Sequence, residues 1–103
     1  MMLKKNMDCK IFWTEEAIRN LEEILEYLYS MWTQKEVDNF KAKLSKQIGL
    51  IRSYPKLFPI SIFQKRLRKA VLSKQTTIFY EVNNKTIYLA YIIVNYKSTD
   101  RLK

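Results

Sequence analysis

The 103-residue chain contains no histidine and a single cysteine, Cys9. Without histidine, a Ser-His or Cys-His nucleophilic pair is excluded, and the common zinc sites lack their ligands. A lone cysteine forms no internal disulfide, which fits a reducing cytosol. We therefore expect no bound metal and no cofactor.

Glycine and long apolar runs are also scarce. The one glycine, Gly49, excludes a phosphate-cradling loop of the Walker or Rossmann type. No apolar stretch approaches the roughly 20 residues that span a bilayer. The start, MMLKKNMDCK, is charged but has no apolar segment behind it, so it does not resemble a signal peptide. The sequence predicts a single domain, residues 1–103, in the cytoplasm and without a membrane partner.

Acidic side chains are few in the second part of the chain. Residues 61–103 carry nine basic and two acidic side chains and account for most of the net charge of +9. A basic half on a small domain favours a polyanionic partner, either nucleic acid or an acidic protein. The alternative is a solvated basic surface that has no specific partner.

Two helices are predicted in the first half. Thr14 is placed to cap the first helix, and Thr33 with Glu36 forms a capping box for the second, which ends at Tyr54-Pro55. Apolar residues recur at helical spacing along both segments. Only a tight turn fits between them, so they form an antiparallel αα-hairpin.

The remaining segments predict strands. Residues 8–13 are expected to form a short strand at a sheet edge, and residues 53–64 an irregular connector with two prolines and exposed aromatics. A basic strand then leads into a hairpin with Asn83-Asn84 at its turn. This turn places Tyr80 opposite Ile87, and the core face of the hairpin then contains Ile78, Tyr80, Ile87, Leu89, Tyr91 and Ile93. The order β-α-α-β-β-β predicts an α+β fold, with the helical hairpin on one face of a C-terminal three-stranded antiparallel sheet.

The candidate site is a cluster of basic and aromatic side chains. Arg66 and Arg68 are expected on one strand face with Lys69 opposite, Lys74 at the mouth of the next strand, and Tyr96-Lys97 at the end of the last. If these groups converge, they form a cationic patch floored by Phe79, Tyr88 and Tyr96. Such a patch suits a single-stranded nucleic acid, or the charged transition state of metal-free RNA cleavage. Alternatively, the cations keep an edge strand soluble and the aromatics only pack.

The segments WTEEA and RKAVLSKQTTIFYEVNNKTIYLAYII resemble the RelE/ParE family of toxins from type II toxin–antitoxin systems, which are associated with plasmid stabilisation. The resemblance runs from Lys10 over nearly the whole chain. It implies a cytoplasmic toxin that a cognate antitoxin keeps inactive. RelE-like members cut mRNA in the ribosomal A site with basic residues and a tyrosine, whereas ParE-like members poison DNA gyrase.

By position, Arg68 matches the family's basic residue at the start of the second strand, and Tyr80 matches its frequent tyrosine on the third. Thr77 stands where many RelE-like members have arginine. Asn95, Tyr96 and Lys97 stand where arginine or a histidine-tyrosine pair is common. The resemblance therefore leaves the target open.

Three functions follow as hypotheses. The first is a metal-independent mRNA endonuclease that acts on the ribosome. Its catalytic residues would be Arg68, Lys74 and Tyr96, and its RNA-binding residues Arg66, Lys69, Phe79, Tyr88 and Lys97. The second is a ParE-like inhibitor of DNA gyrase without nuclease activity. The third is a small basic nucleic-acid-binding domain without toxicity.

Overall fold

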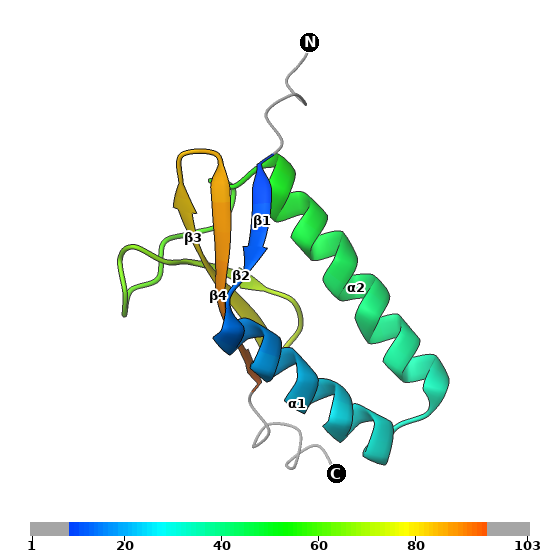
Figure 1. Cartoon of the computed structure of the whole chain (residues 1–103). Helices are drawn as coiled ribbons and strands as arrows, with labels where there is room; N and C mark the ends of the chain where they lie inside the picture. Colours follow the sequence, from blue (N-terminus) through cyan, green and yellow to red (C-terminus); the bar gives the residue numbers. More distant parts are fainter. Residues whose placement is uncertain (1–8, 95–103) are drawn as a thin grey trace.

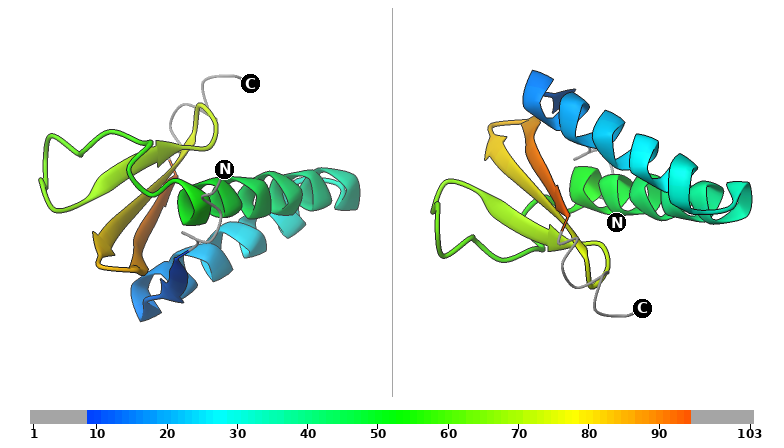
Figure 2. Two further views of the ribbon diagram at one scale, coloured as in Figure 1. Left: turned by 90° about the horizontal axis from the view of Figure 1, so that it is seen from above. Right: turned by 90° about the horizontal axis from the view of Figure 1, so that it is seen from below.

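The computed structural model describes residues 9–94. Two helices cover one face of a four-stranded sheet (Figures 1 and 2), which confirms the α+β class. The elements in chain order are β1 (Lys10–Trp13), α1 (Glu15–Met31), α2 (Gln34–Ser53), β2 (Arg68–Val71), β3 (Thr76–Asn83) and β4 (Thr86–Val94).

The sheet has one more strand than expected. Its order is β1-β4-β3-β2, and β1 pairs in parallel with β4, with Ile11 beside Ile87. The three C-terminal strands are antiparallel, as predicted. The predicted edge position of the N-terminal strand is confirmed, but the sheet is mixed because this strand joins it. Pairing with β4 places Ile11 and Trp13 against the core cluster.

Both helix caps are confirmed, and one of them also joins α1 to the sheet. The Thr14 hydroxyl accepts a hydrogen bond from the Ala17 amide (3.1 Å) and donates one to the Leu89 carbonyl (2.7 Å). Six residues further along the chain, the Asn20 side-chain oxygen accepts from the Ile92 amide at 3.0 Å. In α2, Thr33 accepts from the Glu36 amide at 3.3 Å.

The core consists of the apolar residues that the strand pattern identified. Ile78, Tyr80, Ile87 and Leu89 have no exposed surface, and Ile51 of α2 is equally buried. Each of these side chains gains about 1.5–3 kcal/mol from burial. The hairpin of β3 and β4 is thus the centre of the molecule.

The turn of this hairpin lies one residue later than predicted. Asn83 pairs with Thr86, so Asn84 and Lys85 form the turn, and Asn84 has a φ of 60°. Tyr80 therefore lies opposite Leu89 rather than Ile87. Moving the pairing by two residues leaves every side chain on the same face, so the hydrophobic pattern alone does not distinguish the two registers.

A β-bulge changes the face assignment in the second half of β4. Tyr80 pairs with Leu89 but Phe79 pairs with Tyr91, which leaves Ala90 as the extra residue. Beyond Ala90 the alternation reverses, so Ile92 is buried (3% exposed) while Tyr91 and Ile93 are 36% and 48% exposed. The expectation that Tyr91 and Ile93 belong to the core is therefore wrong.

Candidate functional site: the outer face of the sheet

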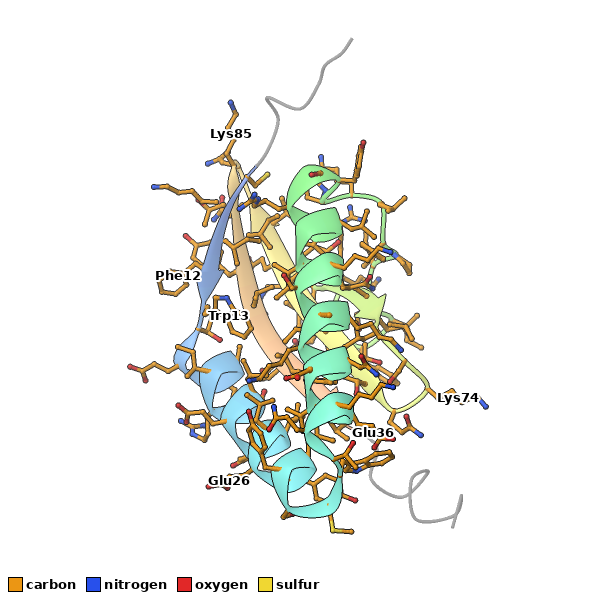
Figure 3. All side chains as sticks on the ribbon, turned by 90° about the vertical axis from the view of Figure 1, so that its right-hand side faces the viewer. Phe12, Trp13, Glu26, Glu36, Lys74 and Lys85 are labelled. Atoms are coloured by element: carbon orange, nitrogen blue, oxygen red, sulfur yellow. The ribbon has the colours of Figure 1, made fainter. Side chains whose placement is uncertain are left out.

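The sheet face turned away from the helices, here called the outer face, is built from three rows of side chains that cross the strands. The rows follow from the strand register and the alternation of side chains. Figure 3 shows Phe12, in one of these rows, pointing away from both helices. The rows are Phe12–Tyr88–Glu81, Tyr91–Phe79–Lys69 and Ile93–Thr77–Val71.

The outer face is largely apolar and open to solvent. Phe12, Val71 and Ile93 are each about half exposed. The Phe12 and Tyr88 rings meet edge to face with centroids 5.4 Å apart. Contiguous exposed apolar surface of this kind marks an interaction site on a small protein.

Four of the predicted site residues are brought together here. Lys69 and Phe79 are direct cross-strand partners, and Tyr88 lies in the adjacent row. Arg66 joins the same face through the carboxylate of Glu81, with Nε 3.4 Å from Oε1. The predicted floor of aromatic rings beside basic groups is therefore present, as far as the described residues extend.

Arg68 lies on the other face of the sheet, opposite Tyr80. Its Nη1 donates to the Phe58 carbonyl at 2.8 Å. The expectation that Arg66 and Arg68 share a face is wrong. The strand begins only at Arg68, so the period of two does not extend back to Arg66.

Tyr80 and Arg68 both hold the connector between α2 and β2, and this pair of side chains is here called the clamp. The Tyr80 hydroxyl donates to the Pro55 carbonyl at 2.6 Å, and its ring meets that of Phe58 edge to face. Burial raises the pKa of Tyr80 to about 12, although nearby Arg68 acts in the opposite direction. A neutral, buried phenol of this kind is suited to holding structure rather than to exchanging protons near neutral pH.

The other predicted catalytic residues are not part of the outer face described here. Lys74 lies between β2 and β3, and Figure 3 shows it on the opposite side of the molecule from Phe12. Tyr96 and Lys97 lie outside the described residues. Within residues 9–94, no three histidine, cysteine, aspartate or glutamate side chains gather to hold a metal ion. None of the helices described is long and apolar enough to cross a membrane.

Sequence reasoning missed several residues of this surface. Val71 was not singled out, and Tyr91 was assigned to the core because the bulge at Ala90 has no local sequence signal. Phe12 was detectable, because Ile11 and Trp13 are partly buried against the core, so the residue between them in the strand faces outward. The exposed aromatics expected in the connector are confirmed by Phe63, which is 87% exposed.

Comparison with known proteins agrees with this geometry. The family model described as ParE toxin of type II toxin-antitoxin system, parDE, matches residues 11–94. The chromosomal ParDE system from P. aeruginosa contains a chain of similar fold, with a TM-score of 0.72 at 13% identity over 85% of this chain and 97% of that one. A chain of the E. coli DinJ-YafQ toxin-antitoxin complex gives 0.62 at 10% identity, over 87% and 96%. Comparison with curated protein sequences gives no match.

An antiparallel helical hairpin over a sheet of order β1-β4-β3-β2 is the fold of a small toxin of the RelE/ParE group. Within this group, the chain belongs to the ParE toxin family of type II toxin–antitoxin systems.

Proposed function

We propose that this toxin acts by binding DNA gyrase, as the family resemblance implies for ParE-like members, rather than by cutting mRNA. The clamp on the connector carries the proposal. Arg68 and Tyr80, which match the family's basic residue on the second strand and its frequent tyrosine on the third, both donate to connector carbonyls, at 2.8 and 2.6 Å. Each side chain thus makes a hydrogen bond that holds the connector.

The distribution of the remaining cations supports the same conclusion. Metal-free RNA cleavage requires a proton acceptor and a cation within hydrogen-bonding reach of one phosphate. Lys69 lies on the outer face, Arg68 on the opposite face, and Lys74 in the loop between β2 and β3. Binding a protein target requires no such convergence.

We further propose that the partner is a cognate antitoxin that covers the outer face. Half-exposed Phe12, Val71 and Ile93 offer apolar surface, with Lys69 and Arg66 beside it. An acidic, amphipathic antitoxin segment would complement both properties, because its charge steers the encounter and its apolar side chains remove the rings from water. Structures of similar fold come from a ParDE system and a DinJ-YafQ toxin-antitoxin complex.

The toxin–antitoxin assignment is tested by expression. Induction of this chain alone should stop growth, and co-expression of the neighbouring open reading frame should restore it. A variant with Phe12→Asp and Val71→Asp should remain toxic but escape rescue, because it loses the proposed antitoxin contact. Rescue equal to that of the wild type would contradict the placement of the antitoxin on the outer face.

The target is tested by running two reactions on the same purified protein. When the toxin is added to gyrase and supercoiled plasmid, cleavage complexes should accumulate. When it is added to translated mRNA, toeprinting should show that the mRNA stays intact. Unaffected gyrase together with cut mRNA would reject the proposal. Binding to single-stranded RNA without growth arrest would instead favour a non-toxic nucleic-acid-binding domain.

One observation favours the mRNA endonuclease as a second candidate. Lys69, Phe79 and Tyr88 lie close together on the outer face, where a base could stack on a ring while its phosphate meets the lysine. If mRNA is cut, Lys69→Ala and Tyr96→Phe should each slow cleavage. By analogy with the loss of an oxyanion-hole donor, each would remove about 2.7–4 kcal/mol of transition-state stabilisation. Under the gyrase proposal, neither variant changes an RNA product, because none forms.

A further inference from the structure

The loop from Ser61 to Leu67 presents two apolar side chains almost completely to solvent. Ile62 is 81% and Phe63 is 87% exposed, the highest values among the large apolar residues described. Both ends of the loop are buried, with Ser61 and Leu67 each 2% exposed. An adjacent isoleucine and phenylalanine outside a core mark a contact site, because exposed apolar surface is unfavourable in water.

Hydrogen bonds hold the loop in this conformation. The Ser61 amide donates to the Leu67 carbonyl at 2.8 Å, and the Leu67 amide donates to the Gln64 carbonyl at 2.9 Å. The Ser61 hydroxyl oxygen accepts from the amides of Phe63 (3.1 Å) and Gln64 (3.4 Å). The tip is therefore presented by an ordered turn, so a partner that binds it has little loop entropy to remove.

The loop is also fixed to the sheet. The Lys69 amide donates to the Pro59 carbonyl at 2.9 Å, and Ile60 forms a β-bridge with Arg68. Upstream, the Arg68 and Tyr80 clamp holds the carbonyls of Phe58 and Pro55. In Figures 1 and 2 the loop projects from the side of the sheet away from the helices. The clamp residues thus act as positioning residues for this loop.

The charge around the tip identifies the kind of partner. Lys65 and Arg66 lie two and three residues after Phe63, and the chain as a whole has a net charge of +9. A second copy of this chain would be repelled, whereas an acidic surface would be attracted. Ile62 has no ring on which a base could stack, so the pair suits an apolar protein pocket better than a nucleic acid.

We infer that this loop is the target-contacting element of the toxin, which inserts Ile62 and Phe63 into an apolar pocket with an acidic rim on the target protein. The inference rests on the proposed function, because it requires the target to be a protein. Arg66, in the loop, pairs with the carboxylate of Glu81, which lies on the outer face. An antitoxin bound on that face would therefore lie beside the loop.

A double variant tests the inference. Ile62→Ser with Phe63→Ser removes the two side chains without touching the hydrogen bonds that hold the loop. The matched control is Met31→Ser with Leu50→Ser, which removes two exposed apolar side chains from the helices. Both variants should melt close to the wild-type temperature, because neither changes a buried residue.

Gyrase inhibition by the loop variant should weaken by at least about thirty-fold, the loss expected when an interface hot spot is removed. The control variant should inhibit gyrase like the wild type, and both variants should bind the antitoxin unchanged. Wild-type inhibition by the loop variant overturns the inference. Loss of antitoxin binding by the loop variant also overturns it, since the loop would then belong to that interface.

Growth arrest separates failure of this inference from failure of the proposed function. If the wild-type protein leaves gyrase unaffected, the gyrase target is wrong, and growth arrest by the same variants still tests the loop. Suppose that the loop variant no longer arrests growth, that the control variant still does, and that mRNA stays intact. This combination supports contact of the loop with another protein target. A wild-type dimer that becomes monomeric in the loop variant, by light scattering, would show that a second copy covers the tip and would overturn the inference.

Discussion

Tyr80 shows how one buried hydroxyl couples a strand to a distant loop. Its O–H group donates to the Pro55 carbonyl, 25 residues away along the chain. Tyr80→Phe removes the hydroxyl, so the Pro55 carbonyl loses this hydrogen bond. The variant should be less stable by about 0.5–1.5 kcal/mol, the usual net contribution of one hydrogen bond. Urea unfolding at pH 8 measures this loss, with Tyr54→Phe, at a 61% exposed site, as the control.

The raised pKa of Tyr80 adds a pH dependence of known sign. The folded-state pKa is about 12, above the ordinary value of 10.0, so the folded chain keeps this proton longer than the unfolded chain. The resulting stability is fully present below pH 10 and is lost as the pH rises from 10 towards 12. The stability difference between wild type and Tyr80→Phe should therefore shrink above pH 10. A constant difference up to pH 11.5 would contradict the shift.

At the scale of elements, the attachment of α1 differs from that of α2. Thr33 only caps its helix, whereas Thr14 caps α1 and also donates to the Leu89 carbonyl. Thr33→Ala should destabilise by about 1 kcal/mol, the usual value of an N-cap. Thr14→Ala should destabilise by about 1 kcal/mol more, because the strand carbonyl also loses its donor. Serine at either position should recover most of the loss in a denaturation experiment, whereas equal losses for both alanine variants would exclude the added role of Thr14.

The bulge in β4 makes a prediction that simple alternation would reverse. Ile92 is 3% exposed and Ile93 is 48% exposed. Ile92→Asp should destabilise by more than about 3 kcal/mol or prevent folding, because it buries an unpaired carboxylate. Ile93→Asp should change stability by no more than about 0.5 kcal/mol. Circular dichroism and thermal melting of the two variants measure these stabilities. If Ile93→Asp were the less stable variant, the bulge would lie elsewhere.

For the whole molecule, the uneven charge governs association. An acidic antitoxin should bind at a rate that falls by at least about tenfold between 50 and 500 mM NaCl, because salt screens the steering field. The dissociation rate should change far less. A triple variant with Lys65→Gln, Arg66→Gln and Lys69→Gln should show a weaker salt dependence in stopped-flow kinetics. An unchanged salt dependence would show that these three cations do not steer the encounter.

The sequence by itself determined the features that depend on local chemistry. The caps at Thr14 and Thr33, the helix end before Pro55 and the buried set Ile78, Tyr80, Ile87 and Leu89 were all predictable, because capping and periodicity act over a few residues. The aromatic floor of Phe79 and Tyr88 beside Lys69 followed from the same alternation.

Only the tertiary structure decided the features that depend on long-range pairing. Registers that differ by two residues bury the same faces, so the turn at Asn84-Lys85 was not determined by the hydrophobic pattern. The bulge at Ala90 lies where α1 meets β4, since Thr14 bonds the Leu89 carbonyl and Asn20 bonds the Ile92 amide. The partner of Arg68 is a carbonyl ten residues away, and its position depends on how the connector folds back on β2. Because the contacts of a side chain depend on what lies beside it, the hydrogen bond from Arg68 to the Phe58 carbonyl could not be predicted from the sequence.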